Sequence, residues 1–571
     1  MAVNRAGVFA VVGMAALLFL SQGIDAPFTK DQEPQSAGWL RDVAVNGHWL
    51  VAHDDYGYVN RKPPLYYWLS ALAVRATGGE VNEINARVVS LAAGAVLAGI
   101  VALWSRAYLG AAEAWLAPLF LLGCYGFASR ATAALTDMLL SLLLFVAYCL
   151  LYPQIEGRGS NSRAAVVGTL LGLAILTKGP VAIALIALAA SIYLMLGRRR
   201  PWEPIREPWP WIAIAIAVAI AACWYIPALI AGGRDLFVVY VQEENLGHLL
   251  PVRFGGTGEA ARPFYYIAAR MIGGAMPLAL LLPALVVALW TGGFDPEARR
   301  PILFQLSLPL AVLALFSVAS SKRDDYVLPA MPGLAIALAA LFARRYTPRP
   351  GMSGRAEVAA SATDLIAVII AAASAAAVLG ALVFFRLGGT ISAGLQSSDA
   401  AYVAMFERGM MTLAGPFGAF TGAVVLGAII VFVGFARRAP VWNGAGLGLI
   451  GIAGVSLFAG TLRPDLARVR TVRGVAEQVH RRIGNAPIFV LGGSNYEFSF
   501  YYGRGVPVWT GRGDPAATVA SRPIYVAATP RDLDRLDDQT RLRLRLVMGG
   551  DNVGGGGPLS LYQFVPLREH H

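Results

Sequence analysis

The sequence predicts an all-α polytopic membrane protein that ends in a small α/β domain outside the membrane. Hydrophobic residues make up 57% of the 571 residues and charged residues only 14%, whereas soluble domains carry about 25% charged residues. The apolar residues are gathered in runs of roughly 18–25, the length that crosses a bilayer as a helix. The final stretch of about 110 residues lacks such runs and has the short, Gly-punctuated pattern of a small domain.

About thirteen runs qualify as transmembrane helices, with ends uncertain by a few residues. They lie near 6–23, 85–105, 110–128, 133–151, 164–177, 180–197, 209–232, 270–292, 302–319, 326–344, 363–385, 412–436 and 441–461. The first run follows Arg5 and has no convincing small-residue cleavage site. We therefore interpret it as a retained first span, with a signal peptide as the alternative.

Arginine in the short connections predicts the orientation. With the first helix starting in the cytoplasm, every inside connection carries arginine, as the positive-inside rule requires. These arginines are Arg106, Arg158, Arg163, Arg198, Arg199, Arg200, Arg206, Arg299, Arg300, Arg344, Arg345, Arg349, Arg355, Arg437 and Arg438. The loops 24–84 and 233–269 and the tail, residues 462–571, then lie on the outer side.

The charge distribution and the cysteine positions argue against a nucleic-acid-binding protein and against a protein held together by disulfides or by metal bound to cysteine. The net charge of +12 is placed mainly in these connections, so it does not indicate a nucleic-acid partner. The three cysteines, Cys124, Cys149 and Cys223, all lie inside apolar runs, which argues against a disulfide framework and against a cysteine metal site.

The outer loop, residues 24–84, is predicted to hold two short amphipathic helices near 36–46 and 64–76. In the tail, RTVRGVAEQVHRRIG has Val472, Val475, Ala476 and Val479 at helical spacing and ends at Gly484, which predicts an amphipathic helix. The segments PIFVLGG, RPIYVAAT and LSLYQFVPL predict strands of one sheet.

Charged and other polar side chains at the edge of the predicted membrane converge from five outer segments. Such groups are costly in lipid and are usually functional. They are Asp31 and Glu33, then Asp137, then Lys178, then Glu243, Glu244, Asn245 and His248, and finally Ser321, Lys322, Arg323, Asp324 and Asp325. One pocket would explain all of them.

This mixture suits group transfer from a phosphorylated lipid. Lys62, Lys178 and Lys322 are placed to neutralise a phosphate leaving group. A carboxylate near the acceptor can take its proton, and two carboxylates can hold a divalent cation that bridges the phosphate. The residues alone do not separate a base from a metal ligand.

Structural alternatives remain open for each candidate. The acids at 31–33 are also typical of a solvated loop or helix cap. Asp137 is a plausible partner of Arg130, Lys62 can snorkel at the interface, and the Tyr66–Trp68 cluster suits an interfacial belt. His53, Asp54 and Asp55 form a secondary metal candidate, although exposed loops often have such a composition.

Eight segments together resemble one known family. They are NGHW (46–49), RKPPLYYW (61–68), ATAALTDMLL (131–140), LTKGPVA (176–182), EENLGH (243–248), RPFYY (262–266), SSKRDDYVLPAMPGLA (320–335) and YEFSFYYGRGVPV (496–508). In order and membrane side they resemble the GT-C glycosyltransferases of the protein-mannosyltransferase and lipid A 4-amino-4-deoxy-L-arabinose transferase type.

The resemblance implies transfer of a sugar from a polyprenyl-phosphate donor on the periplasmic side. Lys62 takes the place of the phosphate-contacting lysine, with Arg61, Lys178 and Lys322 beside it. Asp137 takes the place of the essential membrane-edge aspartate, and Glu33 or Asp31 that of the first-loop acid. Tyr66, Glu244, Asn245 and Tyr326 are expected to line the substrate cavity.

The chain departs from the family pattern at three positions. Gln32 stands where the family has its leading Asp, Arg61 where it often has a glutamate, and Asn245 where a histidine ligand is expected. A divalent cation, held by Glu33 and Asp137, therefore remains only a possible cofactor.

The resulting expectation is a monomeric GT-C enzyme of the bacterial inner membrane. Residues 1–461 form the transmembrane domain and residues 462–571 the periplasmic α/β domain. The donor is an undecaprenyl-phosphate sugar, the acceptor is lipid A or another envelope glycolipid, and the reaction inverts the anomeric carbon. The alternatives are a protein O-mannosyltransferase and, in another class, a transporter or flippase of a lipid-linked sugar.

Overall fold

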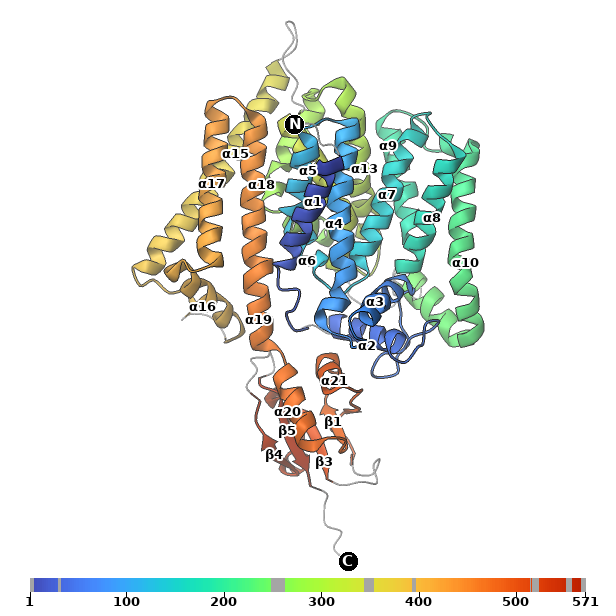
Figure 1. Cartoon of the computed structure of the whole chain (residues 1–571), viewed down its shortest axis with the longest axis vertical. Coiled ribbons are helices and arrows are strands. Elements are labelled where there is room, and N and C mark those ends of the chain that lie inside the picture. The colour runs from blue at the N-terminus through green and yellow to red at the C-terminus, as the bar shows by residue number, and fades with distance from the viewer. Residues whose placement is uncertain are drawn as a thin grey trace, which may run out of the picture.

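The structure is a computed structural model that describes most of the chain. The described residues are 5–28, 32–247, 262–343, 354–392, 397–513, 515, 523–550 and 557–565. Figure 1 shows a helical bundle whose helices run along the long axis of the molecule, with a small sheet-bearing part below one end.

The bundle contains helices of unequal length. They are α1 (Arg5–Leu20), α4 (Glu83–Tyr108), α5 (Glu113–Leu122), α6 (Tyr125–Ala131), α7 (Asp137–Ile155), α8 (Asn161–Lys178), α9 (Val181–Leu196), α10 (Pro208–Phe237), α11 (Tyr266–Gly274), α12 (Leu282–Thr291), α13 (Pro296–Val318), α14 (Met331–Ala343), α15 (Gly354–Arg386), α16 (Ser397–Thr412), α17 (Pro416–Ala436) and α18 (Pro440–Leu457). Single-turn or π segments precede or extend several of them, such as η5 (Asp324–Ala330) before α14.

Among the described residues, eight helices are long and apolar enough to cross a membrane, or nine if the bent pair α11 and α12 is one span. The helices α1, α5, α8 and α9 are shorter or more polar but lie alongside them in the same bundle (Figure 1). The chain is therefore a multi-pass membrane protein. The count of thirteen spans remains a prediction.

Two predicted spans are broken. The span near 110–128 divides into α5 and α6, because Gly123 and Cys124 interrupt the helical hydrogen bonding. The span near 270–292 divides into α11 and α12, which are bent by 107°. Polar side chains come to one end of the bundle partly through such breaks.

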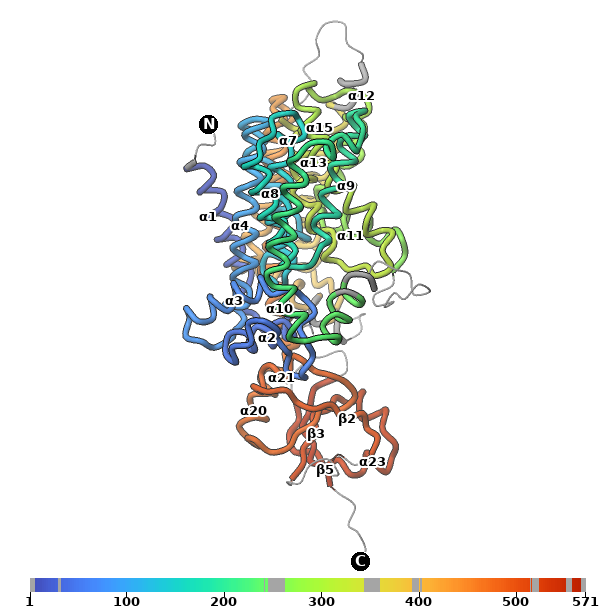
Figure 2. Tube along the Cα trace, turned by 90° about the vertical axis from the view of Figure 1, so that its right-hand side faces the viewer, coloured from blue at the N-terminus to red at the C-terminus, as the bar shows by residue number. Residues whose placement is uncertain are grey.

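Two short helices lie across one end of the bundle and form an outer layer. They are α2 (Gln32–Ala44) and α3 (Leu65–Ala76), and Figure 2 shows them between the bundle and the sheet. Both predicted outer helices are confirmed, although α2 begins four residues before the predicted position 36. This shift places Glu33 in the first turn of α2.

The tail forms a five-stranded sheet in the order β2-β1-β3-β5-β4. The strands are β1 (Ile488–Leu491), β2 (Val508–Trp509), β3 (Ile524–Ala528), β4 (Leu544–Met548) and β5 (Ser560–Phe564). Strand β1 pairs in parallel with β2 and β3, and β5 pairs antiparallel with β3 and β4. The three predicted strands are confirmed as β1, β3 and β5.

Helices α19 (Arg463–Arg470), α20 (Arg473–Ile483) and α21 (Tyr496–Tyr502) connect the bundle to the sheet. The predicted amphipathic helix is α20, which buries Val475, Ala476 and Val479. Helix α21 lies on the side of the sheet that faces α2 (Figure 1). The tail therefore contacts the outer layer.

Candidate active site

Two neighbouring cavities lie where the bundle meets the outer layer. The first, of about 330 Å³, is walled mainly by apolar side chains of α7, α9 and α13 and is called the apolar cavity. The second, of about 320 Å³, is walled mainly by polar side chains of the outer loop and is called the polar cavity. Both are lined by Lys62, Asp137, Lys178, Glu244 and Asp325. These five charged side chains therefore form the junction between the apolar cavity and the polar cavity.

Asp137 and Lys178 form an ion pair at this junction. Asp137 begins α7 and Lys178 ends α8, and the two helices pack together. Gly179 follows with a φ of 91°, a backbone conformation that glycine adopts without strain, so the helix stops there. The Lys178 ammonium also lies 5.4 Å from the centre of the Tyr326 ring, which is a cation–π distance.

Lys62 and Glu244 form a second ion pair. Lys62 precedes two prolines, and its backbone N–H donates to the side-chain oxygen of Asn60 at 2.9 Å. Burial lowers the pKa of the Lys62 ammonium, although the Glu244 carboxylate opposes that shift. Arg61 lies beside the pair, 4.0 Å from Glu244.

Arg130 and Asp325 form a third ion pair at 2.7 Å. Arg130 comes from α6 and Asp325 from the turn η5 before α14. A further cation, Arg323, lines the polar cavity. Two buried carboxylates, Asp137 and Asp325, and the partly buried Glu244 thus each pair with a cation, because unpaired charges would be costly there.

This arrangement is suited to a phosphate at the junction. Lysine and arginine donors make short, charge-assisted hydrogen bonds to phosphate oxygens. An entering phosphate competes with the carboxylates for Lys62 and Lys178, and the carboxylates it displaces gain the capacity to accept a proton. The junction can therefore stabilise a phosphate leaving group and accept a proton from an incoming hydroxyl.

Several predicted residues lie at the cavities. Lys62, Asp137, Lys178 and Glu244 line both, Tyr326 lines the apolar cavity and Arg61 lines the polar cavity. The structure thus brings together residues from the outer loop, α7, α8, the segment after α10, and η5.

Glu33, a predicted catalytic acid, lies away from both cavities. Its two carboxylate oxygens accept hydrogen bonds from Arg87 at 2.9 and 3.1 Å, and one of them also accepts the Ala134 N–H at 2.8 Å. Burial alone would raise the pKa of this carboxyl, but the Arg87 guanidinium holds the pKa below its ordinary value. Glu33 therefore joins α2, α4 and the segment before α7, and the structure gives it a structural position.

Lys322 and Tyr66 also point elsewhere. The Lys322 ammonium donates to the Ala319 carbonyl oxygen at 2.6 Å, and the Tyr66 hydroxyl donates to the Ala86 carbonyl oxygen at 2.7 Å. Neither lines either cavity. Instead, their neighbours Arg323 and Tyr67 line the polar cavity.

Three candidates lie outside the residues that the structure describes. They are Asp31, His248 and the side chain of Asn245. Their predicted roles stay predictions.

The predicted pair of metal ligands does not come together. Glu33 is held by Arg87, and Asp137 by Lys178. In the described part of the chain, no group of three or more His, Cys, Asp or Glu side chains could hold a metal ion. The divalent cation stays a prediction, and no step below uses one.

The secondary metal candidate at 53–55 forms part of the loop structure. The Asp54 carboxylate accepts the backbone N–H groups of Tyr56 and Tyr58 at 3.0 and 2.9 Å. The Asp55 carboxylate pairs with Arg41 at 3.2 Å. These contacts shape a turn of the outer loop.

Sequence reasoning missed several side chains of the polar cavity, among them Gln35 and Tyr496. Gln35 lies in α2, and its amide donates to the Tyr496 hydroxyl at 2.9 Å and to Asp54 at 3.0 Å. Tyr496 lies 461 residues further along the chain. The only signal was that Tyr496 begins the last of the eight family-like segments.

Known proteins have similar sequences. The model of the family described as dolichyl-phosphate-mannose-protein mannosyltransferase matches residues 61–226. An undecaprenyl phosphate-α-4-amino-4-deoxy-L-arabinose arabinosyl transferase of Pseudomonas fluorescens is 24% identical over 58% of this chain and 56% of its own length. The transferase of the same name from Pseudomonas savastanoi is 28% identical over 54% of this chain and 56% of its own length. The chain thus spans little more than half the length of these curated relatives.

A solved structure matches almost the whole fold. The crystal structure of ArnT from Cupriavidus metallidurans bound to undecaprenyl phosphate has a TM-score of 0.69, with 16% identity over 99% of both chains. The chain has the GT-C fold. The same protein in the apo state matches with a TM-score of 0.68 over 98% of both chains. The fold class predicted for this GT-C chain, and its resemblance to the ArnT and protein-mannosyltransferase type, are confirmed.

Proposed function

We propose that this GT-C chain is a glycosyltransferase that moves a sugar from undecaprenyl phosphate to lipid A or another envelope glycolipid. The observation that carries the proposal is the junction of three ion pairs between an apolar and a polar cavity. The apolar cavity suits a polyprenyl chain, and the polar cavity suits a sugar. The names of the relatives support the donor class.

The reaction is an inverting displacement. An oxygen of the acceptor attacks the anomeric carbon, the bond from that carbon to the phosphate oxygen breaks, and undecaprenyl phosphate leaves with the electron pair. Lys62 and Lys178 stabilise the charge on the leaving phosphate. The acceptor proton passes to a carboxylate at the junction, for which Asp137 and Glu244 are the described candidates. The reaction takes place on the periplasmic side of the inner membrane.

The test is transfer by the purified chain. Protein in detergent is mixed with an undecaprenyl-phosphate aminosugar and lipid A, and the mass of the lipid A is followed. A mass increase equal to one sugar residue is expected. Unmodified lipid A, with intact folded protein and a range of donor sugars, would contradict the proposal.

Asp137→Asn serves as the matched inactive variant. It keeps the size of the side chain but removes the charge that holds Lys178, so we expect loss of most of the transfer activity with normal insertion into the membrane. Activity near that of the wild type would remove Asp137 from the site.

A protein O-mannosyltransferase is the second candidate, because the matched family carries that description over residues 61–226. The two candidates differ in the acceptor. Mass spectrometry of periplasmic proteins and of lipid A from a deletion strain separates them: loss of glycopeptides favours the mannosyltransferase, whereas a change of lipid A mass alone favours the glycolipid transferase.

A further inference from the structure

The tail contributes a side chain to the polar cavity. Tyr496 is the first residue of α21 and lines the polar cavity together with Lys62 and Asp137, which belong to the outer loop and to α7. Among the residues that line this cavity, it alone comes from the tail.

The hydroxyl of Tyr496 is held in place at the cavity wall. It accepts a hydrogen bond from the Gln35 amide at 2.9 Å, and the same amide bonds to Asp54 at 3.0 Å. The Tyr496 ring packs edge-on against Tyr56, with ring centres 5.0 Å apart. The Tyr56 hydroxyl in turn accepts the Asn495 N–H at 2.8 Å. The position of Tyr496 is therefore fixed by the outer loop on both sides.

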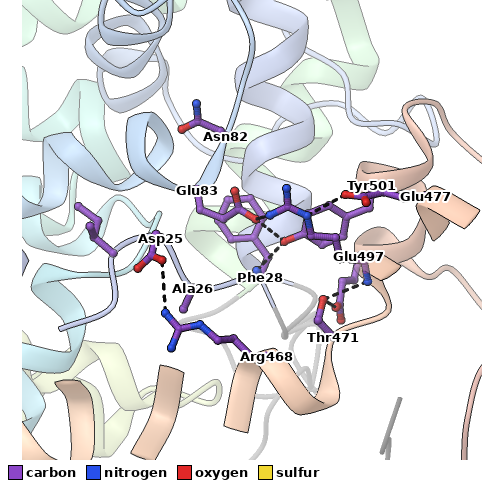
Figure 3. A network of polar contacts seen from close by, with 12 residues as sticks. Asp25, Ala26, Phe28, Asn82, Glu83, Arg468, Thr471, Glu477, Glu497 and Tyr501 are labelled. Carbon is purple, nitrogen blue, oxygen red and sulfur yellow. Dashed lines mark hydrogen bonds and ion pairs between the residues drawn. The ribbon is translucent and has the colours of Figure 1, made fainter. Parts of the chain in front are cut away.

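A second set of contacts fixes the far end of α21. The Tyr501 hydroxyl donates to Glu83 at 2.7 Å and accepts the Phe28 N–H at 2.8 Å. Figure 3 shows Phe28, Glu83 and Tyr501 gathered where the outer loop meets the tail, with Asp25 facing Arg468 nearby. Arg473 also pairs with Glu83 at 3.2 Å. Helix α21 is thus docked rigidly enough to hold one cavity residue in a defined place.

The two cavities divide the substrates between them. The apolar cavity runs between α7, α9 and α13 inside the bundle, and its apolar walls suit a lipid chain. The polar cavity lies between the outer loop and the bundle, with Tyr496 of the tail in its wall, and the outer loop lines it with Gln35, Trp39 and Tyr58. An acceptor headgroup with hydroxyls therefore approaches from the polar side, past Tyr496.

We propose that Tyr496 is a specificity-determining residue that hydrogen-bonds the hydrophilic headgroup of the glycolipid acceptor. The inference rests on the proposed function. Its phenol and the Gln35 amide are neutral polar groups in the wall of the polar cavity, which Lys62 and Lys178 also line. Removal of the phenol oxygen should weaken binding of the acceptor and leave binding of the donor unchanged.

The test measures binding of the two lipids separately. The full-length chain in detergent is titrated with undecaprenyl phosphate and, in a second series, with diphosphoryl lipid A. For Tyr496→Phe we expect the Kd for lipid A to rise about three- to tenfold, as for loss of one hydrogen bond, and the Kd for undecaprenyl phosphate to stay within about twofold of that of the wild type.

Tyr502→Phe is the matched control. It removes one phenol oxygen from the same helix, but that hydroxyl donates to the Gly484 carbonyl at 2.7 Å within the tail, so both affinities should stay at the wild-type values. The inference is overturned if Tyr496→Phe leaves lipid A binding unchanged, or if it weakens the binding of both lipids equally. Wild-type protein that binds only undecaprenyl phosphate would also overturn it, and binding of neither lipid would overturn the proposed function itself.

Discussion

Lys62 and Lys322 are both lysines in outer segments, but the structure gives them different surroundings. Lys62 lines both cavities beside Glu244, whereas the Lys322 ammonium turns back to the Ala319 carbonyl. The two residues therefore form a natural test of which lysines meet the donor phosphate.

Lys62→Met should lower transfer by about a hundredfold or more, the usual cost of removing one donor to a developing negative charge. Methionine keeps most of the length of the stem but carries no charge. Lys322→Met should retain activity within a few-fold of that of the wild type. Initial rates of sugar transfer to lipid A measure the activity of both variants. Equal losses of activity would contradict the assignment of the donor phosphate to the cavities that Lys62 lines.

Glu33 is expected to act through stability rather than chemistry. Glu33→Gln leaves Arg87 buried without its full charge partner, which typically costs about 3–5 kcal/mol. The thermal midpoint of unfolding should fall clearly. Near-normal stability combined with lost transfer would instead restore the catalytic role predicted from the sequence.

The same pair predicts a pH dependence. The pKa of the folded Glu33 carboxyl lies below 4.5, the ordinary value, so its stabilising contribution is complete above pH 4.5 and is lost as the pH falls through the folded pKa. Wild-type protein should lose stability in that acidic range more steeply than Glu33→Gln. Thermal unfolding between about pH 3 and pH 7 measures the difference.

At the scale of elements, the contact between the tail and the outer loop includes one close approach of two backbones, at Gly505. A Cβ atom on Gly505 would lie 1.6 Å from the backbone oxygen of Asp55. Two backbones meet there, so no flexible side chain can move aside. The close approach lets α21 reach α2.

Gly505→Ala should therefore separate the tail from the outer loop, at a cost of about 1–3 kcal/mol or more. We expect faster trypsin cleavage of the tail and weaker lipid A binding. Gly493→Ala, in the same domain but with open space around its Cβ, is the control and should behave as wild type. Identical proteolysis of the two variants would show that the contact does not hold the tail.

The elements near the membrane edge could be predicted because local patterns encode them. A charged residue such as Asp137 or Lys178 next to an apolar run is energetically costly and is therefore usually functional. A short window of sequence is enough to detect it. The ion pair of Glu33 could not be predicted because its partner Arg87 lies 54 residues away, inside α4. Tyr496 was missed because its place in the cavity depends on docking of the tail, which no local pattern reports.

At the scale of the whole molecule, the two ends of the bundle differ in charge and in partners. Figure 1 shows the tail and the outer layer at one end, and the connections from α7 to α8 and from α9 to α10 at the other. Those connections hold Arg158 and Arg198–Arg200, the first turn of α8 holds Arg163, and Arg199 and Arg300 both pair with Glu156 there. The positive-inside rule predicts that this end faces the cytoplasm.

The orientation can be measured with single cysteines. Cys223 is exposed and is first replaced by serine, whereas Cys124 and Cys149 are buried. If the tail lies outside, as the positive-inside rule predicts, Ser494→Cys, next to α21, should react with a membrane-impermeant maleimide added to intact spheroplasts. Glu207→Cys, at the start of α10, should react only after the cells are lysed. Both positions are exposed, so the opposite pattern of labelling would mean that the cavities open to the cytoplasm, where lipid A of the outer leaflet cannot reach them.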